Sequence, residues 1–331
     1  MLDLSGPELS PEDRERIAHP ATGGIILFSR NYQSPEQSAR LVASVRDIRP
    51  GLLIAVDHEG GRVQRFRFGF TRLPPASVYA ASAEPTRMAE TAGWLMAAEL
   101  RSLDVDFSFA PVLDVDCGVS EIIADRAFGA DPVVVSELAT AFARGMKRAG
   151  MAAVGKHYPG HGGVAADSHL ELPVDARPLE DLERRDLVPF RALIAEGLEG
   201  VMPAHVVYSS VDPQPTGFSR FWLEEILRHR LGFRGAIFSD DLSMAGAAFA
   251  GSYVERARLA LEAGCDMVLV CNAPAAADQV LAALAGEVSN PVRQGRLERM
   301  RGGVPWTDNL STSEEWRNAV HLIESLNPNQ K

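Results

Sequence analysis

Short runs of apolar residues recur along the chain, and most are followed by a segment whose apolar positions have helical spacing. The runs cover residues 24–28, 52–57, 105–111, 152–157, 200–205, 236–240 and 267–271, with residues 1–4 as a shorter eighth candidate. Most are continuously apolar and do not alternate with polar residues, which is typical of parallel strands covered on both faces. The pattern therefore predicts eight buried parallel strands.

Helices are predicted between these strands, at residues 35–46, 85–103, 132–148, 179–196, 221–229, 253–263 and 274–284. Ser34 and Pro35 give the first helix a capping residue and a favourable first position. Alternating strands and helices predict an α/β fold, a (β/α)8 TIM barrel, as a single catalytic domain over 1–331 with a helical tail from about 287. The alternative is a doubly wound open sheet, which usually carries a glycine-rich phosphate loop that is not visible here.

Composition narrows the choice of partners. The net charge is −11 and no basic stripe is present, which argues against nucleic acid and anionic membranes. Cys117, Cys265 and Cys271 lack the CxxC spacing of a zinc site or redox pair, and an odd, sparse set fits a reducing compartment. No secretory signal is visible and no apolar run approaches the about 18 residues of a membrane span. We expect a cytoplasmic protein, a monomer without a cofactor.

Charged residues stand at the carboxyl ends of most predicted strands, which is where active sites of barrels form. Asp57 ends one strand and Arg65 follows in the next loop, so together they can accept and donate hydrogen bonds to sugar hydroxyls. Arg126 offers a fixed fork of donors for a hydroxyl, carbonyl or carboxylate. The alternative for Asp57 and Arg65 is a structural ion pair, and the alternative for Arg126 is a solvated loop arginine. The loop after Asp57 also contains Glu59, Arg62 and Gln64, which the sequence does not rank.

One loop near the middle of the chain is rich in histidine and glycine. Lys156 and His157 are adjacent, so strand alternation would send them to opposite faces. Pro159 and Gly160 are expected to end the strand there, which would let both side chains project into the mouth of the barrel. His161 is assigned to loop structure.

Farther along this loop, Asp167 precedes His169 by two residues. A carboxylate at this spacing can reach the imidazole, fix its tautomer and raise its basicity, which is the arrangement of a general acid/base. A surface loop with two polar residues is the alternative. Asp240 ends a buried strand, where a carboxylate is costly unless it has a role, and Asp241 is expected to face the other way.

A metal site is the remaining possibility for the histidines. Candidate ligands are His157, His161, His169, His205, Asp57 and Asp240. No HExxH motif is present, and the lysine beside His157 would repel a cation. We therefore expect no catalytic metal.

Three segments taken together resemble glycoside hydrolase family 3: residues 156–162 (KHYPGHG), 167–169 (DSH) and 237–244 (IFSDDLSM). Within the family, the chain is similar to single-domain bacterial β-N-acetylhexosaminidases, and the similarity extends over nearly its whole length. The resemblance implies a barrel and a retaining mechanism. It makes Asp240 the nucleophile and His169 the acid/base, oriented by Asp167. The implied ligands of N-acetylglucosamine are Asp57, Arg65, Arg126, Lys156 and His157.

The implied substrate is N-acetylglucosamine β-1,4-linked to 1,6-anhydro-N-acetylmuramic acid, with or without its stem peptide, from peptidoglycan recycling. In such a mechanism the carboxylate attacks the anomeric carbon and the histidine protonates the leaving oxygen. Two variants stay open: the 2-acetamido group as nucleophile, and phosphate in place of water. Two other classes also stay open, a metal-dependent amide or ester hydrolase and a non-catalytic sugar-binding barrel.

Overall fold

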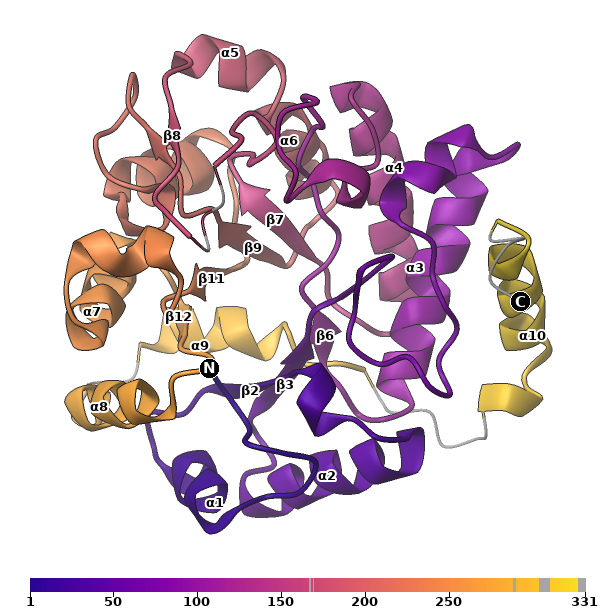
Figure 1. The fold of residues 1–331 in the computed structure, drawn as a ribbon, viewed down its shortest axis with the longest axis horizontal. Helices are drawn as coiled ribbons and strands as arrows, with labels where there is room; N and C mark the ends of the chain where they lie inside the picture. Colours follow the sequence, from indigo (N-terminus) through magenta and orange to yellow (C-terminus); the bar gives the residue numbers. More distant parts are fainter. Residues whose placement is uncertain (167, 169, 288–289, 304–309, 327–331) are drawn as a thin grey trace.

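The computed structural model describes residues 1–166, 168, 170–287, 290–303 and 310–326. Eight parallel strands occupy its centre, in two four-stranded sheets (Figure 1). The first sheet has the order β1 (Leu2–Asp3), β2 (Gly24–Leu27), β3 (Leu53–Val56), β6 (Phe107–Ser108), and the second has β7 (Val154–Tyr158), β9 (Gly200–Pro203), β11 (Ala236–Asp241), β12 (Met267–Leu269). All eight strands predicted from the apolar runs are present.

Isolated bridges lie between the outer strands of the two sheets. Isolated parallel bridges pair Leu2 with Val270 on one side and Phe107 with Ala152 on the other, and Val112 also pairs with Lys156. Helices surround the strands on the outside (Figure 1). The arrangement is a TIM-barrel-like α/β fold.

The helices are α1 (Pro11–Ala18), α2 (Pro35–Ile48), α3 (Pro85–Arg101), α4 (Pro132–Arg148), α5 (Leu179–Arg184), α6 (Leu187–Ala195), α7 (Tyr253–Ala263), α8 (Pro274–Leu284), α9 (Pro291–Glu298), α10 (Glu314–Glu324), and a π-helix over Phe221–Arg230. Short 3-10 helices cover Ser29–Asn31, Ala76–Ala81, Ala124–Arg126, Thr216–Phe218, Ala245–Ala250 and Leu310–Thr312. Two small strand pairs are added in the loops, β4 (His58–Gly60) with β5 (Val63–Gln64) and β8 (Val174–Asp175) with β10 (Val207–Tyr208).

Two helical details differ from the sequence prediction. The helix predicted over residues 179–196 is divided into α5 and α6, and the break coincides with Asp186, whose buried carboxylate pairs with Arg177 at 2.8 Å. The prediction also omitted α1, although its start carries a clear signal. Ser10 and Asp13 form a capping box there, in which each side chain accepts a hydrogen bond from the other residue's backbone.

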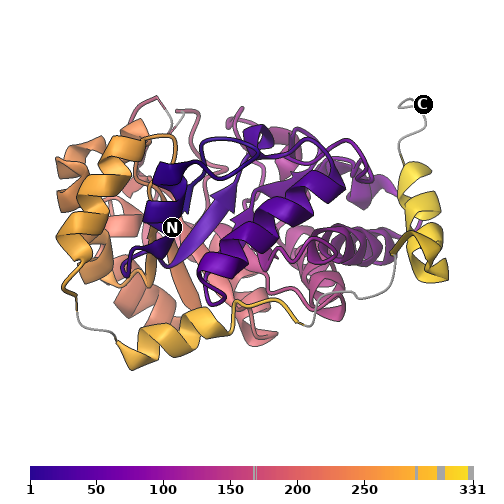
Figure 2. The same ribbon diagram turned by 90° about the horizontal axis from the view of Figure 1, so that it is seen from below.

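The segment after residue 287 contains α9 and α10, and these helices contact different parts of the fold. Arg296 of α9 pairs with Asp266 just before β12, at 3.1 Å. Trp316 of α10 donates its indole N–H to Glu99 of α3, at 3.0 Å. Figures 1 and 2 both place α10 at one end of the molecule beside α3. No helix in the described part of the chain is long and apolar enough to cross a membrane.

Aromatic side chains fill the space between the strands. The rings of Phe107, Phe109 and Phe238 have centroids 5.2–5.5 Å apart and are completely buried. Phe109 also borders a pocket at the carboxyl ends of the strands, together with Ile26 and Leu269. The core therefore provides the apolar floor of that pocket.

Candidate active site

The pocket at the carboxyl ends of the strands collects the predicted site residues. Asp57, Arg65, Arg126, Lys156, His157 and Asp240 all border it. They come from the ends of β3, β7 and β11 and from the loops after β3 and β6. Asp167 and His169 lie outside the described residues, but Ser168 between them borders the same pocket.

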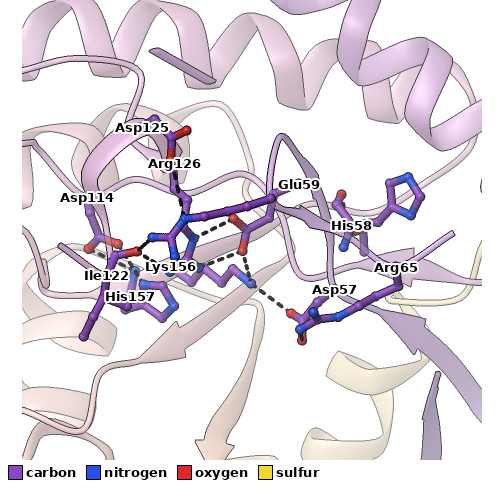
Figure 3. Close-up of polar contacts among 12 residues, drawn as sticks. Asp57, His58, Glu59, Arg65, Asp114, Ile122, Asp125, Arg126, Lys156 and His157 are labelled. Carbon is purple, nitrogen blue, oxygen red and sulfur yellow. Dashed lines mark hydrogen bonds and ion pairs between the residues drawn. The ribbon is translucent and has the colours of Figure 1, made fainter. Parts of the chain in front are cut away.

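Glu59 is the centre of the charged network in this pocket (Figure 3). Its carboxylate forms a two-pronged pair with Arg126, with both distances at 2.8 Å, and lies 2.6 Å from the Lys156 ammonium. The Glu59 side chain is only 8% exposed, so solvent hardly weakens these pairs. Burial alone would raise the pKa of Glu59, but Arg126 and Lys156 bring it well below its ordinary value.

Lys156 is held between two carboxylates. Its ammonium lies 2.9 Å from Asp57 as well as 2.6 Å from Glu59. Burial alone would lower the pKa of Lys156, but the two carboxylates raise it above its ordinary value, so the side chain is a cation. Asp57 in turn faces Arg65 at 3.5 Å. Lys156 is therefore a fixed hydrogen-bond donor and not a base.

The strand carrying Lys156 ends directly before Pro159, as the sequence predicted. β7 continues through His157 to Tyr158, yet Lys156 and His157 both border the pocket. The pairing of β7 with β9 shifts register between Lys156 and Tyr158. A local irregularity of this kind re-aims a side chain, so alternation along a regular strand does not apply here.

Asp114 forms hydrogen bonds with His157, the neighbour of Lys156. Its buried carboxylate lies 2.7 Å from His157 Nδ1 and accepts the backbone N–H of His161 at 2.6 Å. The sequence assigned His161 to loop structure, and its bond to Asp114 fits that role. Its ring also borders the pocket, with Nε2 at 3.3 Å from Ser168 Oγ.

The two neighbouring aspartates of β11 have different surroundings. Alternation predicted only Asp240 in the mouth, whereas both residues border the pocket. Asp241 accepts hydrogen bonds from the Ser243 N–H, the Ser243 hydroxyl and the Cys271 N–H, at 2.6–3.0 Å. Burial raises the pKa of Asp241 to about 6. Asp240 accepts a hydrogen bond from the Asp241 N–H at 2.8 Å, the one bond to its carboxylate within the described chain.

No group of three His, Cys, Asp or Glu side chains among the described residues is arranged to hold a metal ion. His205 is buried, with Nε2 at 3.1 Å from the Asp241 carbonyl oxygen. The carboxylates of Asp57 and Glu59 are both paired with the ammonium of Lys156, at 2.9 Å and 2.6 Å.

Sequence reasoning did not single out Glu59 or Asp114. Both follow apolar runs, as the chosen residues do, but nothing local marks them as partners of Arg126 and His157. Those partners lie 67 and 43 residues away in the sequence.

Comparison with known proteins places this geometry in a family. The chain matches the glycosyl hydrolase family 3 N-terminal domain over residues 2–300. A beta-hexosaminidase of Methylococcus capsulatus is 63% identical over 330 residues, covering 99% of each chain. One of Thiobacillus denitrificans is 56% identical over 335 residues, covering 98% of this chain and 93% of the relative.

Solved structures agree with these relatives. The crystal structure of NagZ from Neisseria gonorrhoeae in complex with N-trifluoroacetyl-D-glucosamine superposes with a TM-score of 0.92 at 44% identity, covering 98% of this chain and 97% of that one. The chain is therefore a glycosidase of the β-N-acetylhexosaminidase type, acting on β-N-acetylglucosaminides, and it belongs to glycoside hydrolase family 3.

Proposed function

We propose that this glycosidase removes non-reducing terminal N-acetylglucosamine from 1,6-anhydro-N-acetylmuramic acid muropeptides in peptidoglycan recycling, with retention of configuration. Asp240 attacks the anomeric carbon and forms the glycosyl-enzyme. His169, oriented by Asp167, protonates the leaving oxygen and then activates water. Asp57, Arg65, Arg126, Lys156 and His157 bind the sugar.

The observation that carries the proposal is the difference between Asp240 and the other pocket carboxylates. Asp57 and Glu59 are neutralised by cations within 2.9 Å, and Asp241 is engaged by three hydrogen bonds. Asp240 accepts one backbone bond in the described part of the chain, so its second oxygen is available for attack.

The same comparison supports a histidine as the acid. Retaining glycosidases usually use a second carboxylic acid that stays protonated near neutral pH. Burial raises the pKa of Asp57 and Glu59, but their cationic neighbours outweigh it and leave both below their ordinary values. Asp57 and Glu59 therefore do not hold a proton at neutral pH. Asp241, whose pKa burial raises to about 6, has its carboxylate engaged by the three hydrogen bonds from Ser243 and Cys271. An imidazole titrates in the required range without special burial.

Replacing Asp240 by alanine tests the proposal. Turnover of an aryl β-N-acetylglucosaminide should fall by about 10⁴-fold or more, as expected for loss of a nucleophile. The same substitution at Asp181, exposed on α5, is the control and should leave turnover unchanged. An Asp240→Ala enzyme with near wild-type turnover would refute the assignment.

A trapping experiment separates Asp240 from the 2-acetamido group as nucleophile. A 5-fluoro N-acetylglucosaminyl donor keeps the acetamido group and slows both steps. Mass spectrometry should then find the sugar on the peptide containing Asp240. Rapid turnover without a labelled peptide would favour substrate assistance.

We further propose that the eight strands close into a (β/α)8 barrel that forms one domain with its helical tail, and that the protein is a cytoplasmic monomer. The bridges between Leu2 and Val270 and between Phe107 and Ala152 support closure. Size-exclusion chromatography with light scattering should give a mass near 35.8 kDa. A mass of twice that value would exclude the monomer.

A further inference from the structure

Asp114 lies behind the pocket, in contact with the chain that forms its wall. Its side chain is fully buried and does not border the pocket itself. Oδ1 accepts the backbone N–H groups of His157 at 3.2 Å and His161 at 2.6 Å, while Oδ2 lies 2.7 Å from His157 Nδ1 (Figure 3). One carboxylate therefore fixes both the backbone and the ring of His157.

The charge of Asp114 determines the direction of the ring hydrogen bond. Burial raises the pKa of this carboxyl, but the His157 ring and the hydrogen bonds it accepts outweigh burial and bring the pKa below its ordinary value. Asp114 is thus ionised at neutral pH and can only accept. The proton of the 2.7 Å bond must then lie on His157 Nδ1.

Where the ring is neutral, a proton on Nδ1 leaves Nε2 as a lone-pair acceptor. His157 borders the pocket, and none of the described residues forms a hydrogen bond with its Nε2. Lys156 beside it is a donor, held by Asp57 and Glu59. The wall thus presents one acceptor next to one donor.

We propose that Asp114 is a positioning residue: it holds His157 in the Nδ1–H tautomer, so that Nε2 accepts a hydrogen bond from a hydroxyl group of the substrate. The inference rests on the proposed role of His157 in sugar binding. It predicts that the site requires a donor at this position, where a fluorine, ether or carbonyl oxygen would not serve.

The tautomer can be measured in the free enzyme, independently of activity. In protein labelled with ¹⁵N-histidine, long-range ¹H–¹⁵N correlation distinguishes a ring with its proton on Nδ1 from one with its proton on Nε2. The signals of His157 are those missing from the His157→Gln variant. We expect the neutral Nδ1–H form near pH 8. An Nε2–H form, or a ring protonated on both nitrogens, would overturn the proposal even if catalysis proceeds as proposed.

Asp114→Asn should reverse the tautomer at nearly constant shape. The carboxamide oxygen can keep the two backbone N–H bonds at the Oδ1 position, so its NH2 group must face Nδ1. Nδ1 then accepts and Nε2 carries the proton. We expect the spectrum to change accordingly and kcat/KM to fall by about 10- to 100-fold, as for other partners that orient a histidine.

Two controls separate positioning from a structural effect. Asp116→Asn alters a carboxylate on the same segment whose one hydrogen bond within the described residues is from the Gly118 N–H at 2.8 Å, and it should leave both readouts unchanged. In a His157→Gln background, Asp114→Asn should change kcat/KM by no more than about twofold, because coupled residues are not additive. An equal loss with and without His157 would refute the proposal.

Substrate analogues supply a specificity readout. Replacing the 3-, 4- or 6-hydroxyl of an aryl β-N-acetylglucosaminide by fluorine removes a donor but leaves a weak acceptor. At the position facing His157, the wild type should discriminate against fluorine, and Asp114→Asn should reduce that discrimination at least severalfold. Identical discrimination in the two enzymes would contradict the inference. If Asp114→Asn does not fold, the wild-type tautomer still decides.

Discussion

Replacing Glu59 by glutamine should damage both stability and activity, because one buried carboxylate neutralises two cations. The change keeps the shape and one acceptor oxygen but removes the charge. Lys156 would retain Asp57 at 2.9 Å. Within the described chain, Arg126 would retain only a bond to the Ile122 carbonyl oxygen at 3.2 Å. The guanidinium would thus become a nearly buried, uncompensated charge.

The size of the effect follows from this burial. The Arg126 side chain is 11% exposed and that of Glu59 is 8% exposed. Removing one partner of a buried pair costs about 3–5 kcal/mol, and the lower end applies because glutamine still accepts a hydrogen bond. About 3 kcal/mol corresponds to a fall in Tm of about 4 °C for a chain of 331 residues. Because Arg126 and Lys156 lose their fixed positions, kcat/KM should fall by about 10- to 100-fold.

Differential scanning fluorimetry and steady-state turnover of an aryl β-N-acetylglucosaminide measure the two effects. Glu121→Gln is the matched control, since Glu121 is exposed near Arg126 and only its backbone carbonyl accepts a hydrogen bond from Arg62. Unchanged Tm and kcat/KM in Glu59→Gln would refute the reasoning. A lower Tm with unchanged kcat/KM would restrict Glu59 to a structural role.

Two further predictions concern stability. Burial raises the pKa of Glu99 from 4.5 to about 7, despite its hydrogen bonds from Thr71 and Trp316. The folded state therefore binds this proton more tightly than the unfolded state, so stability falls as pH rises from 4.5 to 7, by about 3 kcal/mol. Glu99→Gln should flatten this dependence in urea unfolding at pH 5 and pH 8, and parallel losses in both proteins would contradict it. At Gly162, a Cβ would lie 1.9 Å from the Val115 carbonyl oxygen. Gly162→Ala should therefore lower the free energy of unfolding by about 1–3 kcal/mol. An unchanged free energy of unfolding would show that the loop adapts freely.

The eight strands and most helices could be predicted from sequence because their signals are local. Continuous apolar runs mark strands covered on both faces, and Ser34 with Pro35 marks the start of α2. The division between α5 and α6 was missed, although Pro189 lies inside the predicted helix of residues 179–196 and cannot donate a backbone hydrogen bond to residue 185. The break also coincides with the buried pair between Asp186 and Arg177, a contact that exists only after folding.

Part of the site could also be predicted, because strand ends have local signals in the sequence. Asp57, Lys156, His157 and Asp240 end buried strands, and the alternation of strands and helices brings such ends to one face. The sequence by itself thus determined that these four strand-end residues meet at one pocket. Only the tertiary structure decided how they are paired: Glu59 with Arg126 across 67 residues, and Asp114 with His157 across 43. The physical reason is that periodicity records which face a side chain occupies, whereas the strength of a charge pair depends on distance and burial, which exist only after folding.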